Sequence, residues 1–317
     1  MGTQRNAMRG VASALIGAIA WGFSGTCVQY LFAEASFDAL LITTIRQFGA
    51  GSVFMAVRLL RDRALLKAMW GDRDTRRQLL IFGSFGLFLN STVYSQTVGL
   101  TNAGTATVLQ SLSIVIVLVV SCLRNRRMPK LLEIAALVCA FAAVFLISTG
   151  GDPGTLQLPL MGLLFGLATA FACAFYTSYP KGLMSRYGSF ATTGAGMMVG
   201  GITGLVVWTV TGGVARGIPP IDGTTAGVLA IATLIGTFGA YWLYLNGISI
   251  VGPVAGNMLG AAEPVSATVI SALWLGTSFA WSDWAGLVLM VATIILVAWE
   301  QGRGTRSGDA QDGDGLA

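Results

Sequence analysis

Two charged residues lie inside long apolar stretches of the chain. Glu263 comes 13 residues after Ile250 and 11 before Trp274, and Arg46 comes 8 residues after Asp38. A charged side chain in the middle of such a stretch is costly, and it usually faces a cavity or a partner. We expect Glu263 to bind a substrate ammonium group, a proton, or each in turn. The alternative is a structural ion pair or hydrogen bond, for which Arg46 is the obvious partner.

The residues around Glu263 favour an irregular helix. Pro264 follows Glu263 directly, and proline lacks the backbone N–H, so it can kink a helix. Gly256 and Gly260 form a GxxxG pattern one turn earlier, which lets two helices approach closely. We expect a bent, closely packed helix with Glu263 at the bend. Pro264, Gly256, Gly260 and Arg46 are the candidate structural or gating residues.

Polar side chains concentrate between residues 90 and 113, in two stretches that are otherwise apolar. A helix that faced lipid would not carry so many of them. Helical spacing places Thr107, Gln110 and Ser111 on one face. We expect this face to line an interior, and hydrogen bonding between helices is the alternative. The candidate substrate contacts from this region are Asn90, Tyr94, Thr107, Gln110 and Ser111.

The composition excludes several classes of chemistry. Of 317 residues, 54% are apolar and only 10% are charged, against about 25% charged in ordinary globular chains. The absence of His removes the usual general base and zinc ligand. The four cysteines lie within or at the edge of apolar stretches and fit small core residues. Without a GxxxxGK[ST] pattern, ATP is not the direct energy source. We therefore expect no enzyme, no cofactor and no metal site.

Long apolar segments predict an all-α polytopic membrane protein, because about 20 residues suffice for one crossing. The ten candidate spans are 10–33, 38–60, 78–98, 101–123, 131–149, 158–180, 189–211, 224–246, 250–274 and 279–300. Of 19 Lys and Arg residues, 17 lie at or in the loops and termini of one side, Arg216 lies in a loop of the other side, and Arg46 lies deep within a span. The positive-inside rule then predicts that both termini are cytoplasmic. The net charge of +5 comes from these basic loops, which would lie beside the anionic inner leaflet. The positive charge therefore does not require a nucleic-acid partner.

The two halves of the chain repeat each other at an offset near 150 residues. Gly86 matches Gly236, Phe88 matches Phe238, and Tyr94 matches Tyr244. Because each half holds five spans, an odd number, the second half must enter the membrane in the opposite sense. Such inverted repeats place a binding site near the midplane and suit alternating access.

This organisation predicts five segments. They are a cytoplasmic N-terminus (1–9), a first five-helix repeat (10–149), an external linker (150–157), a second repeat (158–300) and a disordered cytoplasmic tail (301–317).

Several motifs carry a resemblance to a known family. They are AWGFSG (20–25), Arg46, TNAGTATVLQSLSIV (101–115), GTFGAYWLYLNGISIVGP (236–253) and AAEPVSA (261–267). In order and spacing they resemble the drug/metabolite transporter superfamily, in its ten-helix EamA-type branch. The family has a Pro in the fourth span at the position that matches Pro264, whereas this chain has Ile114. The resemblance therefore does not imply the same bend in both repeats.

The resemblance also brings aromatic residues to the expected interface between the repeats. Trp21, Tyr176, Tyr241 and Tyr244 fall on spans that meet there in the family arrangement. They join Tyr94 as candidates to stack on an aromatic ligand or to cage a cation. The alternative for aromatic residues near span ends is a place in the interfacial belts.

The function implied is secondary transport of small amphiphilic metabolites, such as amino acids including aromatic ones, across the inner or plasma membrane. Alternating access and export are the expected mode. The alternative is a proton-coupled carrier of organic cations, of the choline or drug type. The expected partners are a small-molecule substrate and the lipid bilayer, with no nucleic acid. We expect a monomer, and a homodimer is the alternative.

Overall fold

The computed structural model describes residues 2–313 and gives the side chains of residues 6–301. The described residues form helices and connecting loops, with no strand among them. The first half contains α1 (Gly2–Ala33), α2 (Ala39–Arg61), α3 (Arg63–Gly71), α4 (Arg73–Ile81), the π-helix η1 (Phe82–Phe88), α5 (Leu89–Leu100), α6 (Ala103–Ser111), α7 (Ser113–Arg124) and α8 (Leu131–Thr149). The second half contains α9 (Leu160–Ser178), α10 (Lys181–Tyr187), α11 (Ser189–Val210), α12 (Gly213–Arg216), α13 (Gly223–Thr233), the π-helix η2 (Leu234–Gly239), α14 (Ala240–Val251), α15 (Pro253–Gly260), α16 (Ala262–Leu275) and α17 (Trp281–Gly313).

The predicted fold class is confirmed, because the described chain is a bundle of long apolar helices. By length and composition, nine helical segments among the described residues could cross a membrane. The predicted third span is not among the nine, although α4, η1 and α5 follow one another without a break. Its second half is rich in Asn, Ser, Thr and Gln, which lowers the mean hydropathy. The same polar residues that mark an interior face therefore weaken the signal of a span.

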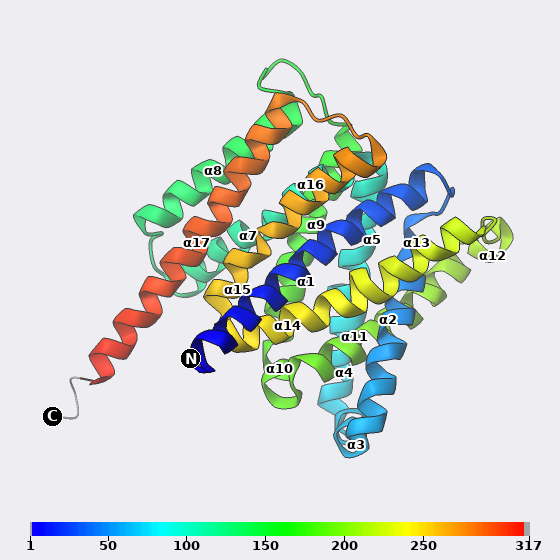
Figure 1. The fold of residues 1–317 in the computed structure, drawn as a ribbon, viewed down its shortest axis with the longest axis horizontal. Helices are drawn as coiled ribbons and strands as arrows, with labels where there is room; N and C mark the ends of the chain where they lie inside the picture. Colours follow the sequence, from blue (N-terminus) through cyan, green and yellow to red (C-terminus); the bar gives the residue numbers. More distant parts are fainter. Residues whose placement is uncertain (1, 314–317) are drawn as a thin grey trace.

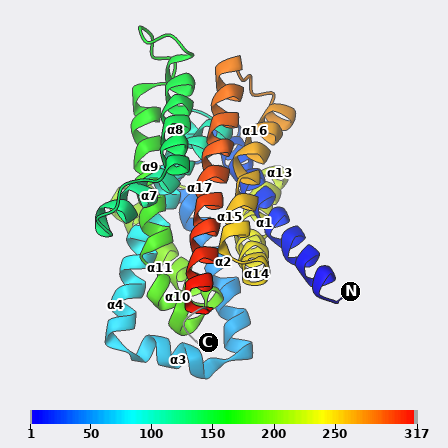
Figure 2. The ribbon, with the colours of Figure 1, turned by 90° about the vertical axis from the view of Figure 1, so that its left-hand side faces the viewer.

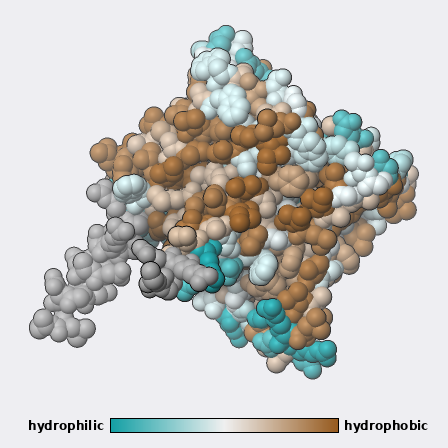
Figure 3. All heavy atoms as spheres, viewed as in Figure 1, coloured by the Kyte–Doolittle hydropathy of each residue, from teal (hydrophilic) through white to brown (hydrophobic). Residues whose placement is uncertain are grey.

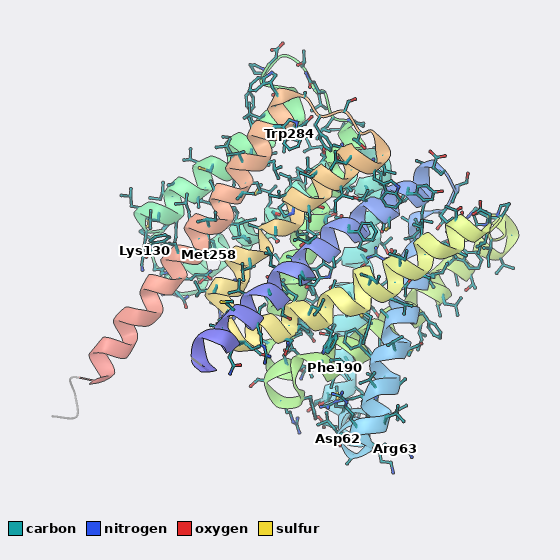
Figure 4. All side chains as sticks on the ribbon, in the orientation of Figure 1. Asp62, Arg63, Lys130, Phe190, Met258 and Trp284 are labelled. Atoms are coloured by element: carbon teal, nitrogen blue, oxygen red, sulfur yellow. The ribbon has the colours of Figure 1, made fainter. Side chains whose placement is uncertain are left out.

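The surface shows where the apolar residues meet the polar ends (Figure 3). Hydrophobic residues cover the middle of the visible face, and hydrophilic residues gather at its corners. We call the end with α3, the loop at 125–130 and α10 the basic face, since most Lys and Arg residues lie there. The opposite face carries the loops at 34–38, 150–159, 217–222 and 276–280. The start of α1 and the end of α17 lie toward the basic face (Figures 1 and 2). In Figure 4, Arg63 and Lys130 lie toward the basic face, while Trp284 lies toward the opposite face.

The two repeats share an interrupted helix at matching places. In the first repeat α6 and α7 meet at Leu112, whose φ and ψ are −57° and −17°. In the second repeat α15 and α16 meet at Ala261, with values of −61° and −14°. The interruption therefore occurs in both repeats, although Ile114 stands where the resemblance implies a proline. In the first repeat the Ser111 hydroxyl donates to the Thr107 carbonyl at 2.9 Å, a back-bond that often bends helices.

The last helix continues beyond the expected end of the second repeat. Helix α17 runs through Gly313, into the segment 301–317 for which the sequence predicts disorder. Residues 314–317 of that segment lie outside the described residues.

Helices α8 and α17 pack against each other along one side of the bundle (Figure 1). Arg127 donates two hydrogen bonds to the buried Glu133 carboxylate, at 2.7 and 2.8 Å, and the Lys130 backbone N–H donates a third. Lys130 also forms an ion pair with Glu300 of α17 at 2.7 Å. The hydrogen bond to Glu133 raises the pKa of the Arg127 guanidinium above its ordinary value. These contacts join the two helices at the basic face.

The substitution Glu133→Ala is expected to destabilise the protein by about 1–3 kcal/mol, because it removes three hydrogen bonds that involve a charged acceptor. The Arg127 side chain is 35% exposed and can reach water, so the loss stays below that of a fully buried pair. The measurement is the thermal unfolding midpoint in detergent. Arg186→Ala, which breaks the exposed ion pair with Asp72, is the control and should change the midpoint little. Equal midpoints for the two variants would contradict this assignment.

Candidate functional site

A cavity of about 240 Å³ lies between the two repeats. Both repeats contribute to its wall, through α1, α2, α5 and α6 from the first half and α9, α11, η2, α14, α15 and α16 from the second. The lining residues are Trp21, Ser24, Gly25, Thr43, Arg46, Gln47, Asn90, Ser91, Tyr94, Gln110, Cys173, Tyr176, Thr177, Met197, Thr237, Tyr241, Tyr244, Asn257 and Glu263. The predicted location at the interface of inverted repeats matches this arrangement.

The charged residues in the described wall of this cavity are Arg46 and Glu263. Among residues 6–301, no ion pair within 4.0 Å joins them. Arg46 instead donates to the Ser24 hydroxyl at 2.5 Å and to the Thr237 hydroxyl at 3.2 Å. Neutral hydroxyls thus hold the guanidinium in place and leave its charge uncompensated by an adjacent carboxylate. The cavity therefore offers one positive and one negative group to a ligand.

The two π-helical segments form hydrogen bonds with Arg46 and Gln47, two adjacent polar residues on α2. The Thr237 hydroxyl, which accepts from Arg46, lies in η2 and donates to the Ala232 carbonyl at 2.9 Å. Gln47, the next residue on α2, donates from its side chain to the Leu87 carbonyl in η1 at 2.7 Å. π-Helical turns are rare and occur frequently at functional sites. Each repeat thus supplies one irregular helical turn that positions a polar side chain of the same helix.

Glu263 lies at the start of α16, two residues after the interruption at Ala261. No hydrogen bond or ion pair involves its carboxylate in the part of the chain with described side chains. Its backbone carbonyl lies close to Gly22, because a Cβ built on Gly22 would come within 2.6 Å of it. Glycine at this position allows α1 to approach α16. The carboxylate is therefore placed by backbone packing and remains open to a ligand or a proton.

An aromatic cluster forms the neighbouring wall. The Trp21 ring lies 4.8 Å from the Tyr241 ring in an edge-to-face arrangement and 4.6 Å from the Tyr244 ring at a tilted angle. The Tyr244 hydroxyl donates to the Gly256 carbonyl at 3.0 Å, and it also touches Gly260. The two glycines of the GxxxG pattern therefore face α14, and Gly256 also faces Ile248 of that helix. Rings with offset or edge contacts present both faces and edges to a bound group.

The structure brings most of the candidate contacts predicted from sequence to this cavity. Those that line it are Glu263, Trp21, Gln110, Tyr94, Tyr241, Tyr244, Asn90 and Tyr176, together with Arg46. Thr107 and Ser111 do not line it. The Thr107 hydroxyl is buried and shares a hydrogen bond with the Tyr94 hydroxyl at 3.0 Å, and Ser111 bonds back to Thr107. Helical spacing groups these residues with Gln110 on one face of α6, but Gln110 alone of the three lines the cavity, and the Thr107 and Ser111 hydroxyls make hydrogen bonds within the bundle instead.

Pro264 does not line the central cavity. It is buried in the first turn of α16, three residues after the bend at Ala261. A proline in a first turn removes an N–H that has no partner within the helix. Pro264 thus favours a helix that starts here, and its position differs from that of a kink inside a continuous helix.

Other lining residues were not anticipated, and they are mostly small or neutral. They are Ser24, Gly25, Thr43, Gln47, Ser91, Cys173, Thr177, Met197, Thr237 and Asn257. Ser24 and Gly25 belong to the AWGFSG motif, so that motif could have indicated them. Gln47 follows Arg46 directly and could have been recognised as a second polar residue on α2. Cys173 and Met197 carry no signal of this kind in the sequence.

A second cavity of about 380 Å³ adjoins the first, since Thr177 and Asn257 line both. Its other lining residues include Lys181, which begins α10, Pro253, which begins α15, and Gln301, which lies in the half of α17 nearer the basic face. The exposed side chain of Asn257 stands where the two cavities meet. The central cavity therefore continues toward the basic face.

Comparisons with known proteins give a consistent result. A sequence profile of the EamA-like transporter family matches residues 8–149 and 160–299. The chain is 31% identical over 307 residues to the uncharacterized inner membrane transporter YicL of Salmonella typhimurium, covering 97% of this chain and 100% of that one. It is 26% identical over 299 residues to the uncharacterized transporter YwfM of Bacillus subtilis, covering 90% and 92% of the two chains.

One solved structure shares the fold, with a TM-score of 0.61 over 94% of this chain and 99% of the other, at 18% identity. That likeness concerns the fold alone. The family profile covers both halves of the chain, and the relatives align with nearly the whole of it. This protein is therefore a membrane transporter that belongs to the EamA-like transporter family.

Proposed function

We propose that this protein is a secondary transporter that moves small amphiphilic metabolites, amino acids and aromatic ones among them, by alternating access. The observation that carries the proposal is the central cavity, where Arg46 and Glu263 make no ion pair with each other and an aromatic wall lies between the repeats. A zwitterion needs a cationic group for its carboxylate and an anionic group for its ammonium. Arg46 and Glu263 have these two charges, and Trp21 offers a ring for an apolar side chain.

We further propose that the basic face is cytoplasmic and that the protein exports its substrate across the inner or plasma membrane. The positive-inside rule supports this orientation. The second cavity supports loading from that side, since it continues from the central cavity toward Lys181. Because the sequence lacks an ATP-binding pattern, a proton gradient would supply the energy. Binding and release of a proton at Glu263 would couple that gradient to transport. We propose that the activity is transport rather than catalysis and that the protein acts as a monomer, with a homodimer as the alternative.

A second candidate, a proton-coupled carrier of organic cations, is favoured by one observation. The carboxylate of Glu263 and the rings of Trp21 and Tyr244 line the same cavity, and this combination suits a quaternary ammonium group. In that case Arg46 would have a structural role through Ser24 and Thr237.

Counterflow in proteoliposomes tests both candidates. Vesicles are loaded with unlabelled aromatic amino acids or with a quaternary ammonium compound, and entry of the labelled compound is followed. We expect accumulation of the amino acid in vesicles loaded with it. Accumulation of the cation alone would establish the second candidate. Accumulation of neither would show that both substrate classes are wrong, while the family assignment would stand.

A further inference from the structure

Three elements meet around one glutamine near the opposite face. The side-chain amide oxygen (Oε1) of Gln29, on α1, accepts from the Ala103 backbone N–H at the start of α6, at 2.9 Å. The same oxygen accepts from the Ser271 hydroxyl on α16 at 2.7 Å. The side-chain NH₂ group of Gln29 donates to the hydroxyl of Thr277, in the loop after α16, at 2.8 Å. The Thr277 hydroxyl also shares a hydrogen bond with the Ser271 hydroxyl. We call these four residues the Gln29 hub.

The hub lies where a path from the central cavity to the opposite face would have to run. Around it, the outer halves of α1, α2 and α6 and part of α13 form a packed apolar cluster that includes Val28, Leu31 and Ala103, each fully buried. Gly104, next to Ala103, lies in contact with Thr268 of α16 and with Phe279. The cavity is thus closed on this side and continues toward the basic face on the other.

The inverted repeat shows what the matching region at the basic face lacks. Trp21, Ser24 and Gly25 correspond to Cys173, Tyr176 and Thr177 in the cavity wall, at a constant separation in the sequence. The same separation matches Gln29 of the first repeat with Lys181 of the second. Lys181 is exposed and lines the second cavity, and no hydrogen bond or ion pair within the described side chains involves it.

The second repeat also lacks a backbone N–H that would correspond to the Ala103 donor of the hub. Helix α15 begins at Pro253, at the position where α6 begins at Ala103, and proline has no N–H to donate. Asn102 also caps α6 by accepting from the Thr105 N–H, while the corresponding cap of α15 is Gly252, which has no side chain. The chain can therefore build the hub at the opposite face but not at the basic face.

We propose that Gln29 is the positioning residue that holds the transporter closed at the opposite face, and that the hub biases the resting protein toward the state open at the basic face. This inference rests on the proposed alternating access. Opening at the opposite face requires α1, α6 and α16 to separate, which breaks the three hydrogen bonds of Gln29. Substrate binding must compensate for their loss in each cycle.

The test measures access to Cys173, a native thiol in the wall of the central cavity. In a background with Cys27→Ala, Cys122→Ala and Cys139→Ala, Cys173 is the remaining thiol. A small, charged, membrane-impermeant methanethiosulfonate is added to vesicles of either orientation. We expect modification of the background protein mainly from the basic face. In Gln29→Ala the rate from the opposite face should rise about tenfold, which corresponds to about 1.4 kcal/mol.

Ser13→Ala is the matched control. Ser13 lies on the same helix and donates to the Leu243 carbonyl at 2.7 Å, but toward the basic face. Its loss should leave access from the opposite face unchanged. If Gln29→Ala does not accumulate, Ser271→Ala with Thr277→Val removes the side-chain partners of Gln29 and should give the same direction of change.

An unchanged rate from the opposite face in folded Gln29→Ala would overturn the proposal. So would equal access from both faces in the background protein, since the hub would then not close that side. The measurement uses no substrate, so its failure is distinct from a failure of counterflow. Altered access without counterflow would support the hub and reject the substrate class.

Discussion

Glu263→Gln is expected to abolish coupled transport while the protein still folds. The substitution keeps the size of the side chain and removes the negative charge and the site for a proton. The Glu263 carboxylate makes no ion pair with Arg46, and no side-chain hydrogen bond in the described chain depends on it, so the fold loses little. Loss of a charged contact in a desolvated site costs about 2–5 kcal/mol, or roughly 30-fold to several-thousand-fold in affinity.

The measurement compares proton-driven uptake with counterflow in proteoliposomes. If Glu263 carries the proton, an imposed pH gradient should drive transport by the native protein and not by Glu263→Gln. The matched control is Asp283→Asn, the same change of carboxylate to amide in the first turn of α17, where the side chain accepts from the Ala280 N–H and does not line the central cavity. Unchanged coupled transport in Glu263→Gln would reject the role. Loss of folded protein would instead indicate that the carboxylate is structural.

The fold follows from features that are local in the sequence. Long apolar segments, the distribution of Lys and Arg, and an internal repeat suffice to predict an all-helical membrane protein with inverted repeats. Glu263 and Arg46 stood out because a charge inside an apolar segment has few explanations. Trp21 was indicated by its place near the middle of a span. These residues all line the central cavity.

The remainder of the site depends on backbone irregularities that spacing does not reveal. Thr107 and Ser111 share a face of α6 with Gln110, but their hydroxyls bond to Tyr94 and to the helix backbone, and neither residue lines the cavity. The π-helical segments place Thr237 against Arg46 and the Leu87 carbonyl against Gln47. Small residues such as Gly25 enter the wall because the Tyr94 hydroxyl rests against them, a contact that only tertiary packing creates.

The same irregularities explain why the site is polar in an apolar bundle. A backbone carbonyl freed by a π-turn or a helix break needs a new partner inside the membrane, because no lipid group can supply one. Gln47 satisfies the Leu87 carbonyl, and Thr237 satisfies the Ala232 carbonyl while it accepts from Arg46. Thr237, which bonds to the irregular backbone, thus also positions the charged side chain of Arg46. Substitution of Arg46 should therefore weaken ligand binding as well as alter the local packing.

Arg46→Gln is expected to separate the two candidate substrate classes. If the guanidinium binds a carboxylate, counterflow of phenylalanine should fall by about 30-fold or more, since the loss of one partner of a buried charge pair costs about 2–5 kcal/mol. Counterflow of phenethylamine, which lacks the carboxylate, should change little. The Gln side chain can still donate to Ser24 or Thr237, so part of the local hydrogen bonding is retained.

Arg46→Lys refines the same test. Lysine keeps the positive charge, but its single ammonium lacks the planar fork with which Arg46 donates to Ser24 and Thr237 at once. We expect it to restore part of the phenylalanine counterflow that Arg46→Gln loses. Arg216→Ala is the control, since Arg216 pairs with Asp38 at the opposite face, 3.6 Å apart and away from the cavity. An equal loss for phenylalanine and phenethylamine would contradict carboxylate binding, because a guanidinium that only supports the fold cannot distinguish the two ligands.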